Sequence, residues 1–264
     1  MREFDCNRFG HSYAYRMTHE PPYTPSERLP SALRQQGYAA MDAHSVRAWA
    51  SCSAQELQTL ATTWDDLPLD PHLKDGGHYR RRRHASYVVQ AGQAQLAPHR
   101  AHWQPLAYNA LHGGIHRWFE PVQAQTLAQP AWTLLLLALT ALADQLRGVR
   151  PWYVEAHQFR IDTAGGIGRP TPEGAHRDGV DFVAVFLLAR LGIKGGETRV
   201  FDVDSPHGQR FTLTQPWSAL VMDDTRVIHE STPIQALQPD AAGAGAYRDT
   251  LVLTCRSGGF LEPV

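Results

Sequence analysis

The stretch PTPEGAHRDG, residues 170–179, decides how the second half of the chain is interpreted. A loop rich in proline and glycine leads here into a His-x-Asp pattern, which precedes an apolar run at 180–188. Side chains two residues apart on a strand share one face. His176 and Asp178 are therefore predicted to begin a strand and to offer an imidazole and a carboxylate to one metal ion.

His229 supplies a third ligand, because it ends the strand-like segment 222–228. Two histidines and one carboxylate on one face of an ion are typical of non-haem Fe(II) sites, which keep open coordination positions. A lone His-x-Asp has little weight in a chain with 14 histidines. Arg248 and Thr250 add to it, since they share a face of the last predicted strand, where a guanidinium and a hydroxyl suit a carboxylate. The alternative for Arg248 is an ion pair at a strand edge.

Short strand-like segments separated by glycine and proline fill the chain beyond Pro151. They lie at 153–154, 180–188, 198–203, 211–213, 218–222 and 250–254. Many short strands at roughly even spacing predict a β sandwich or barrel over residues 151–264. The stretch 240–246, which is rich in alanine and glycine, is predicted to be a flexible loop tip.

The first half of the chain has a mainly helical pattern. Apolar residues recur at three- and four-residue steps over 42–65, which predicts two short amphipathic helices with Ser51 and Ser53 as available N-caps. A further helix is predicted at 132–147, ended by Gly148. Residues 78–89, rich in Tyr and Val, favour a strand, and the proline-rich first 40 residues are expected to wrap the surface. We therefore expect a single α+β domain, 1–264, in which a mainly helical part, 1–150, packs on a β core at 151–264.

Composition excludes several classes of protein. The chain has 25 Lys plus Arg against 26 Asp plus Glu, so its formal net charge of −1 argues against a dedicated nucleic-acid binder. The longest apolar stretch, 132–146, is too short and too polar to span a membrane. Three distant cysteines, Cys6, Cys52 and Cys255, do not make a disulfide framework. Since residues 1–10 also lack an apolar signal core, we expect a cytoplasmic protein.

Four strings carry a specific resemblance: TPEGAHRDG at 171–179, GGET at 195–198, DDTRVIH at 223–229 and YRDTL at 247–251. They resemble the 2-oxoglutarate/Fe(II)-dependent dioxygenases, and within them the bacterial branch that contains isoleucine 4-hydroxylase and related free-amino-acid hydroxylases. That branch also contains the biofilm stress and motility proteins. The resemblance is strongest over 151–256 and weaker at 79–83 and 108–114. It implies a double-stranded β-helix, or jelly roll, with helices packed on one side.

The resemblance also implies roles for residues. His176, Asp178 and His229 would hold Fe(II), and Arg248, helped by Thr250 and Gln158, would bind the cosubstrate 2-oxoglutarate. The implied reaction consumes O₂, converts 2-oxoglutarate to succinate and CO₂, and hydroxylates a small molecule such as a free L-amino acid. No catalytic residue beyond the metal centre is required. A non-catalytic sensor of metal and 2-oxoglutarate, or an oxygenase acting on a macromolecule, is the alternative, and the oligomeric state stays open.

Residues that bind the substrate are harder to choose from the sequence. On the strand-like segment 155–161, Glu155 and His157 share one face while Gln158 and Arg160 share the other, so either face is a candidate for the cavity. Candidates for a substrate carboxylate are Arg160, Arg177 and one of Arg80, Arg81, Arg82 and Arg83; candidates for an ammonium group are Glu155 and Asp181. For each of them a structural ion pair is the simpler interpretation.

The basic run 80–83 is predicted to be a solvated strand with acidic partners rather than a phosphate-binding patch. His112 and His116 have the spacing of one helix face, but Gly113 and Gly114 lie between them and argue against a helix and a metal site there.

Overall fold

The computed structural model describes residues 21–205, 207–238 and 245–263. The helices are η1 (Ser26–Arg28), α1 (Leu29–Gln36), α2 (Ala43–Ala50), α3 (Ala54–Ala61), η2 (Thr62–Trp64), α4 (Ala124–Leu127) and α5 (Pro130–Arg147). The strands are β1 (Tyr38–Met41), β2 (Arg80–Gln90), β3 (Gln93–Leu96), β4 (Trp152–Asp162), β5 (Ile167–Gly168), β6 (Phe182–Leu191), β7 (Ile193–Gly195), β8 (Thr198–Asp202), β9 (Gly208–Phe211), β10 (Ala219–Asp223), β11 (Val227–Ser231), β12 (Ile234–Ala236) and β13 (Tyr247–Ser257). No helix in these ranges is long and apolar enough to cross a membrane.

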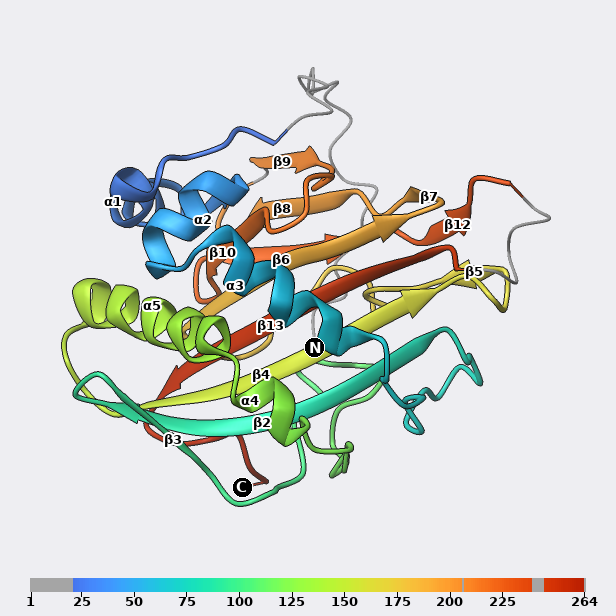
Figure 1. The fold of residues 1–264 in the computed structure, drawn as a ribbon, viewed down its shortest axis with the longest axis horizontal. Helices are drawn as coiled ribbons and strands as arrows, with labels where there is room; N and C mark the ends of the chain where they lie inside the picture. Colours follow the sequence, from blue (N-terminus) through green and yellow to red (C-terminus); the bar gives the residue numbers. More distant parts are fainter. Residues whose placement is uncertain (1–20, 206, 239–244, 264) are drawn as a thin grey trace.

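A seven-stranded sheet with the order β1-β10-β6-β13-β4-β2-β3 dominates the fold. Two three-stranded sheets, β11-β8-β9 and β5-β12-β7, accompany it, and the pairs in all three sheets are antiparallel. Helices α2, α3 and α5 cover one face of the large sheet (Figure 1). These antiparallel sheets with supporting helices confirm the predicted α+β fold. The part of the chain at 1–150 contributes three strands, β1, β2 and β3, to the large sheet as well as all the helices of the described residues.

The long helix α5 buries an apolar stripe against the large sheet. Trp132, Leu135, Leu136 and Leu139 are at most 1% exposed and follow the spacing of one helix face. They belong to the same core as Leu251 and other apolar side chains of β6 and β13. Gly148 ends the helix with a φ of 87°, as predicted.

Helices α2 and α3 also lie where the sequence predicts them. Ser53 caps α3 in a capping box, because its hydroxyl accepts from the backbone N–H of Glu56 while the Glu56 carboxylate accepts from the N–H of Ser53. Ser51 is not an N-cap: it follows the last residue of α2 in the left-handed region, with a φ of 52°. The N-cap of α2 is Asp42, whose side chain accepts from the N–H of Ser45.

The expectation that the first 40 residues wrap the surface is wrong over 26–40. Helix α1 begins there, with Pro30 in its first turn, where a missing N–H costs nothing. Leu29 and Leu33 are buried in the core, and β1 pairs with β10 at the edge of the large sheet. Residues 1–20 of this segment, and residues 240–244 of the predicted loop tip, lie outside the described residues.

Alternation along β4 and β13 separates the helix-covered face of the sheet from its inner face. Val154 and Ala156 on β4, and Leu251 and Leu253 on β13, pack in the core shared with the helices. The side chains between them point the other way, into a cavity. On β4 and β13 those that line it are His157, Phe159, Ile161, Arg248, Thr250, Val252 and Thr254.

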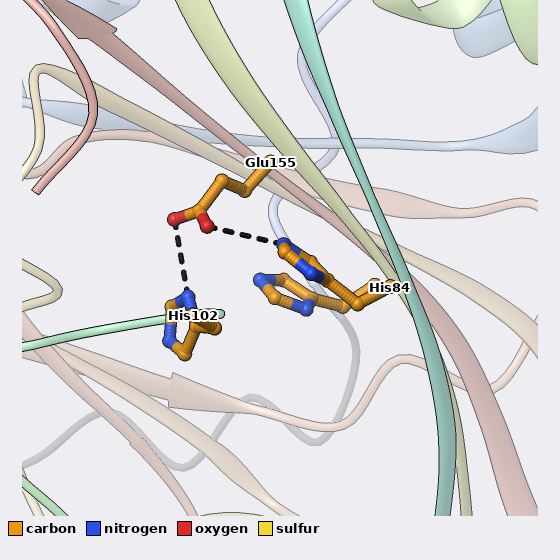
Figure 2. A group of neighbouring side chains, drawn as sticks. His84, His102 and Glu155 are labelled. Atoms are coloured by element: carbon orange, nitrogen blue, oxygen red, sulfur yellow. Dashed lines mark hydrogen bonds and ion pairs between the residues drawn. The ribbon is translucent and has the colours of Figure 1, made fainter. Parts of the chain in front are cut away.

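A buried carboxylate joins β4 to the neighbouring strand β2 and to the long loop at 97–122. Glu155 lies 3.1 Å from His84 Nε2 on β2 and 3.1 Å from His102 Nδ1 on the loop (Figure 2). Burial lowers the pKa of His84, and that of His102 to about 4, so both rings are neutral and donate N–H to Glu155. Burial alone would raise the pKa of Glu155, but His102 and His84 together hold it well below its ordinary value. The cluster therefore depends on uncharged histidines.

Acid should destabilise the fold through this cluster. Below pH 6.5 the unfolded chain protonates its histidines, whereas folded His102 stays neutral down to about pH 4. The unfolded state thus binds more protons, and the free energy of unfolding falls as the pH drops through this window, by up to about 1.4 kcal/mol per pH unit for each such histidine. Urea unfolding at pH 7.5, 6.0 and 5.0 measures the slope.

The variant His102→Asn should have a shallower slope between pH 6.5 and 4, because it removes one histidine that resists protonation. His116, which is exposed, provides the matched control, and His116→Asn should keep the slope of the unaltered chain. Equal slopes in the His102 and His116 variants would contradict this account.

Candidate metal and cosubstrate site

One cavity gathers most of the residues that the sequence singled out. It lies on the inner face of the large sheet, and its lining comes from β2, β4, β6, β11 and β13 and from the loops at 97–122 and 169–181. His176, Asp178, His229, Arg248 and Thr250 all line it. The structure thus brings together residues that are up to 74 positions apart in the chain.

His176, Asp178 and His229 converge with their ligand atoms all within 4.8 Å of one another. His176 Nε2 lies 3.8 Å from one oxygen of Asp178, and His229 Nε2 lies 3.7 Å from the other. The Nδ1 of His176 lies 3.0 Å from the carbonyl oxygen of Gly174, which fixes the proton on Nδ1 and leaves the Nε2 lone pair facing Asp178. Burial, and secondarily His176, lowers the pKa of His229 well below its usual range, so this ring is neutral. Burial opposes the charged form of His176, but Asp178 and Glu173 outweigh it and raise the pKa of that ring. Two imidazoles in their neutral form and a carboxylate are the donors that a divalent metal ion needs.

The backbone that carries these ligands differs from the prediction. His176 and Asp178 do not begin a strand, since β6 starts only at Phe182. His176 instead forms an isolated antiparallel bridge with His229, with reciprocal N–H···O bonds of 3.0 and 2.9 Å. Asp178 lies in the following loop, so the two side chains converge without the alternation of a strand.

The carboxylate of Asp224 holds this loop. It accepts hydrogen bonds from three successive backbone N–H groups, those of Asp178, Gly179 and Val180, at 3.0, 2.8 and 3.1 Å. Burial, and after it the nearby Asp178, raises the pKa of Asp224 to about 7. Two carboxylates so close together repel each other, and a cation between the triad ligands would relieve that repulsion.

Arg248 is a buried cation without a counter-ion. It is 5% exposed, and within the described residues its guanidinium forms no hydrogen bond or ion pair. Burial, and to a lesser extent Arg190, lowers its pKa to about 10, so it remains charged at neutral pH. The ion pair at a strand edge is therefore not its role in this structure. A buried, unpaired guanidinium next to the hydroxyl-bearing Thr250 suits the carboxylate of a ligand.

The two faces of β4 resolve the choice that the sequence left open. His157 faces the cavity, and its Nδ1 accepts a 2.7 Å hydrogen bond from Arg82. Gln158 and Arg160 face away from it: Gln158 donates to Thr63, and Arg160 pairs with Asp249 at 2.7 Å. The prediction that Gln158 contacts the cosubstrate, and that Arg160 contacts the substrate, is therefore not compatible with where these side chains point.

Three further residues that were candidates for substrate binding contact other parts of the protein instead. Glu155 is occupied by His84 and His102, as described above. Asp181 accepts from the N–H and the hydroxyl of Ser257, and Arg177 donates to the carbonyl oxygen of Asp224. None of the three lines the cavity.

The basic run on β2 alternates as a strand should. Arg81 and Arg83 pair with Asp162 and Asp66 on the outer side, as predicted for a solvated strand. The prediction is wrong for Arg80 and Arg82, which are at most 5% exposed and line the cavity.

Sequence reasoning missed three cavity residues. Glu173 lies 3.5 Å from His176 Nε2, and its Oε2 is buried without a hydrogen-bond partner. Gln104 donates to Asp178 Oδ1 at 3.2 Å and accepts from Arg117 at 2.8 Å. Glu173 stands in the motif itself and could have been suspected, whereas Gln104 and Arg117 lie in a loop with no periodic signal.

A second group of metal-ligand residues, His84, His102, Glu155 and His157, also has donor atoms within 4.8 Å of one another. Its surroundings do not favour a cation. Arg82 donates to His157, and an Arg100 nitrogen lies 3.8 Å from Glu155, so guanidinium groups already supply the positive charge.

Comparison with known proteins assigns the family. Residues 61–254 match the family model described as 2OG-Fe dioxygenase. A crystal structure of a bsmA homolog from Methylobium petroleophilum PM1 is 51% identical, with 92% of this chain and 97% of that chain covered and a TM-score of 0.85. A search of the curated proteins gives no match.

More distant structures share the fold. IDO from Bacillus thuringiensis is 17% identical, with a TM-score of 0.70 over 90% of this chain and all of that chain. The Fe(II)/α-ketoglutarate-dependent dioxygenase TqaL is also 17% identical, with a TM-score of 0.63 over 88% of this chain and 86% of that chain. The predicted jelly-roll core is confirmed, and the cofactors of the family are the predicted Fe(II), 2-oxoglutarate and O₂. The chain belongs to the 2OG-Fe dioxygenase family and is a 2-oxoglutarate-dependent dioxygenase.

Proposed function

We propose that this dioxygenase hydroxylates a small, amino-acid-like molecule. In this proposal His176, Asp178 and His229 hold Fe(II), and Arg248, with Thr250, binds the distal carboxylate of 2-oxoglutarate. The observation that carries it is the convergence of three metal-ligand side chains and one unpaired buried guanidinium in a single cavity. When bound, iron and 2-oxoglutarate supply the oxidising power for an unactivated C–H bond, with succinate and CO₂ as products of the cosubstrate.

The residues of the chain orient and shield the reactants. The Gly174 carbonyl sets the tautomer of His176, and the Gln104 amide occupies one oxygen of Asp178, which directs the other oxygen toward the metal. Arg248 would hold the cosubstrate, because its planar guanidinium matches a carboxylate in shape. Hydrogen abstraction from carbon needs no general base, so the protein contributes position and the exclusion of water.

The amino-acid assignment rests on polar atoms in the cavity wall that have no hydrogen-bond partner. Buried guanidinium nitrogens of Arg82 and Arg117 lack hydrogen-bond partners, and so does one carboxylate oxygen of Glu173. A zwitterion has complementary groups for both kinds of charge. The resemblance to the free-amino-acid hydroxylases supports the same substrate class.

Iron and cosubstrate binding should be visible in an anaerobic titration of the reduced apoprotein with Fe(II) and 2-oxoglutarate. We expect a metal-to-ligand charge-transfer band in the unaltered chain and none in His176→Ala. In Arg248→Ala the dissociation constant for 2-oxoglutarate should rise by roughly 10- to 100-fold, because a charge-assisted hydrogen-bond pair is lost. His116→Ala, on an exposed site, is the control. Absence of the band from the unaltered chain would refute the assignment of the site.

Gln104→Leu should weaken metal binding, because the carboxylate of Asp178 loses the amide that orients it. Loss of such an outer partner lowers metal affinity by about 10- to 100-fold. Calorimetric titration with Mn(II) measures it without turnover. Gln93→Leu, at an exposed position of β3, should bind Mn(II) as the unaltered chain does. Equal affinity in the two variants would show that Gln104 does not position Asp178.

Succinate release from 2-oxoglutarate in air, scored over the common L-amino acids, tests the substrate class. Stimulation by one or a few amino acids is the expected result. Stimulation by peptides alone would favour a macromolecular substrate. A charge-transfer band without turnover of any substrate would favour a sensor.

A further inference from the structure

We propose that Arg82 and Arg117 form a second anion site in the cavity, which binds the carboxylate of the substrate. This inference rests on the proposed function and names the residues that select the substrate. The site is separate from the cosubstrate anchor, because Arg82 is on β2 and Arg248 is on β13, with β4 between them.

Arg82 is held rigidly with part of its guanidinium unused. Its guanidinium carbon lies 3.6 Å from the ring centre of Phe119 and 4.4 Å from that of Phe159, so it makes cation–π contacts with both rings. Nη2 donates to His157, and Nη1 lies 3.7 Å from Asp70. Nε is buried without a partner. The planar group is therefore fixed in position before any ligand arrives.

Arg117 approaches the same cavity from the loop at 97–122. It is 2% exposed, its Nη2 donates to Gln104, and its Nε is buried without a partner. Through Gln104 it connects to Asp178, so an anion held by Arg117 lies next to the proposed iron site. A substrate anchored there would present its carbon chain near the metal.

Local carboxylates do not reach every donor of these cations. Asp70 is shared between Arg80, at 2.7 Å, and Arg82, at 3.7 Å, while Glu155 accepts its hydrogen bonds from two histidines. Burial, and then the neighbouring Arg80, lowers the pKa of Arg117 to about 10, and burial lowers that of Arg82 well below its ordinary value. Guanidinium groups are not deprotonated in proteins, so the Nε–H groups of both arginines remain donors that lack acceptors. Leaving buried donors unpaired is costly, and an anion would satisfy them.

The carboxylate of Glu173 restricts which anionic ligands fit the site and favours an amino acid. Glu173 lines the same cavity, and its unpaired carboxylate oxygen would repel a phosphate more strongly than a carboxylate, because a phosphate carries more negative charge. The same oxygen can accept from an ammonium group. A carboxylate at the two arginines and an ammonium at Glu173 together describe an α-amino acid.

Matched ligands test the site directly. Protein loaded with Fe(II) and 2-oxoglutarate under anaerobic conditions is titrated calorimetrically with pools of the common L-amino acids and with pools of their α-amides. We expect at least one acid to bind and its amide to bind at least ~10-fold more weakly, since the amide has no charge to satisfy the guanidinium groups.

Variants of Arg117 test whether this site causes the preference for the acid over its amide. In Arg117→Gln the dissociation constant of the preferred acid should rise by roughly 10- to 100-fold, with a smaller rise in Arg117→Lys, which keeps the charge but not the planar fork. Arg81→Gln removes a neighbouring arginine on the outer side of β2 and should bind the acid normally. The charge-transfer band at saturating Fe(II), with the circular dichroism spectrum, checks that each variant is folded and loaded.

Three results would overturn the inference while leaving the proposed function intact: equal binding of acid and amide, unchanged binding in both Arg117 variants, or no binding of any acid by a protein that forms the band. Failure of the band to form in the unaltered chain would instead remove the proposed function itself.

Discussion

Two backbone hydrogen bonds between His176 and His229 hold the site together. They join a loop to the strand β11, at a point where no regular sheet connects them, and they set the spacing of both imidazoles. Asp224 extends this arrangement by accepting from three successive N–H groups of the loop, which places Asp178 beside the two rings. Gln104, Arg117 and the cavity wall are positioned relative to that carboxylate. If the bridge were lost, the metal ligands would no longer converge.

Local patterns in the sequence were sufficient to predict the helices and strands that bury only one face. The apolar stripe of 132–147 predicts α5 because a helix must bury one face, and Ser53 followed by Glu56 marks the start of α3 for the same local reason. The longer strands of the second half were also located, within a few residues, whereas the short strands β5, β7 and β12 were not predicted. The predicted segment 222–228 proved to contain the turn between β10 and β11. The patterns failed at 26–40, where prolines suggested an irregular surface segment, although proline in the first turn is compatible with α1.

The site was predictable in its residue types and not in its geometry. His176, Asp178, His229 and Arg248 line one cavity, yet the backbone at His176 depends on pairing with β11, a contact that no local period encodes. The cavity face of β4 was equally undetermined, because both faces carry polar residues. It is set by the packing of Thr63 against Gln158 on one side and of His102 against Glu155 on the other. Both contacts join segments more than 50 residues apart.

Buried donors without acceptors in the cavity wall lower the stability of the whole molecule. Buried guanidinium donors without acceptors cost stability, and the chain offsets part of this by contacts of Arg82 with the rings of Phe119 and Phe159 and by bonding Arg117 to Gln104. Those contacts satisfy some donors and leave others free. The donors left free are the ones that a ligand can use, so the residual electrostatic cost and the capacity to bind an anion have the same origin. Complete internal hydrogen bonding of these donors would make the fold more stable and would leave the substrate carboxylate no partner.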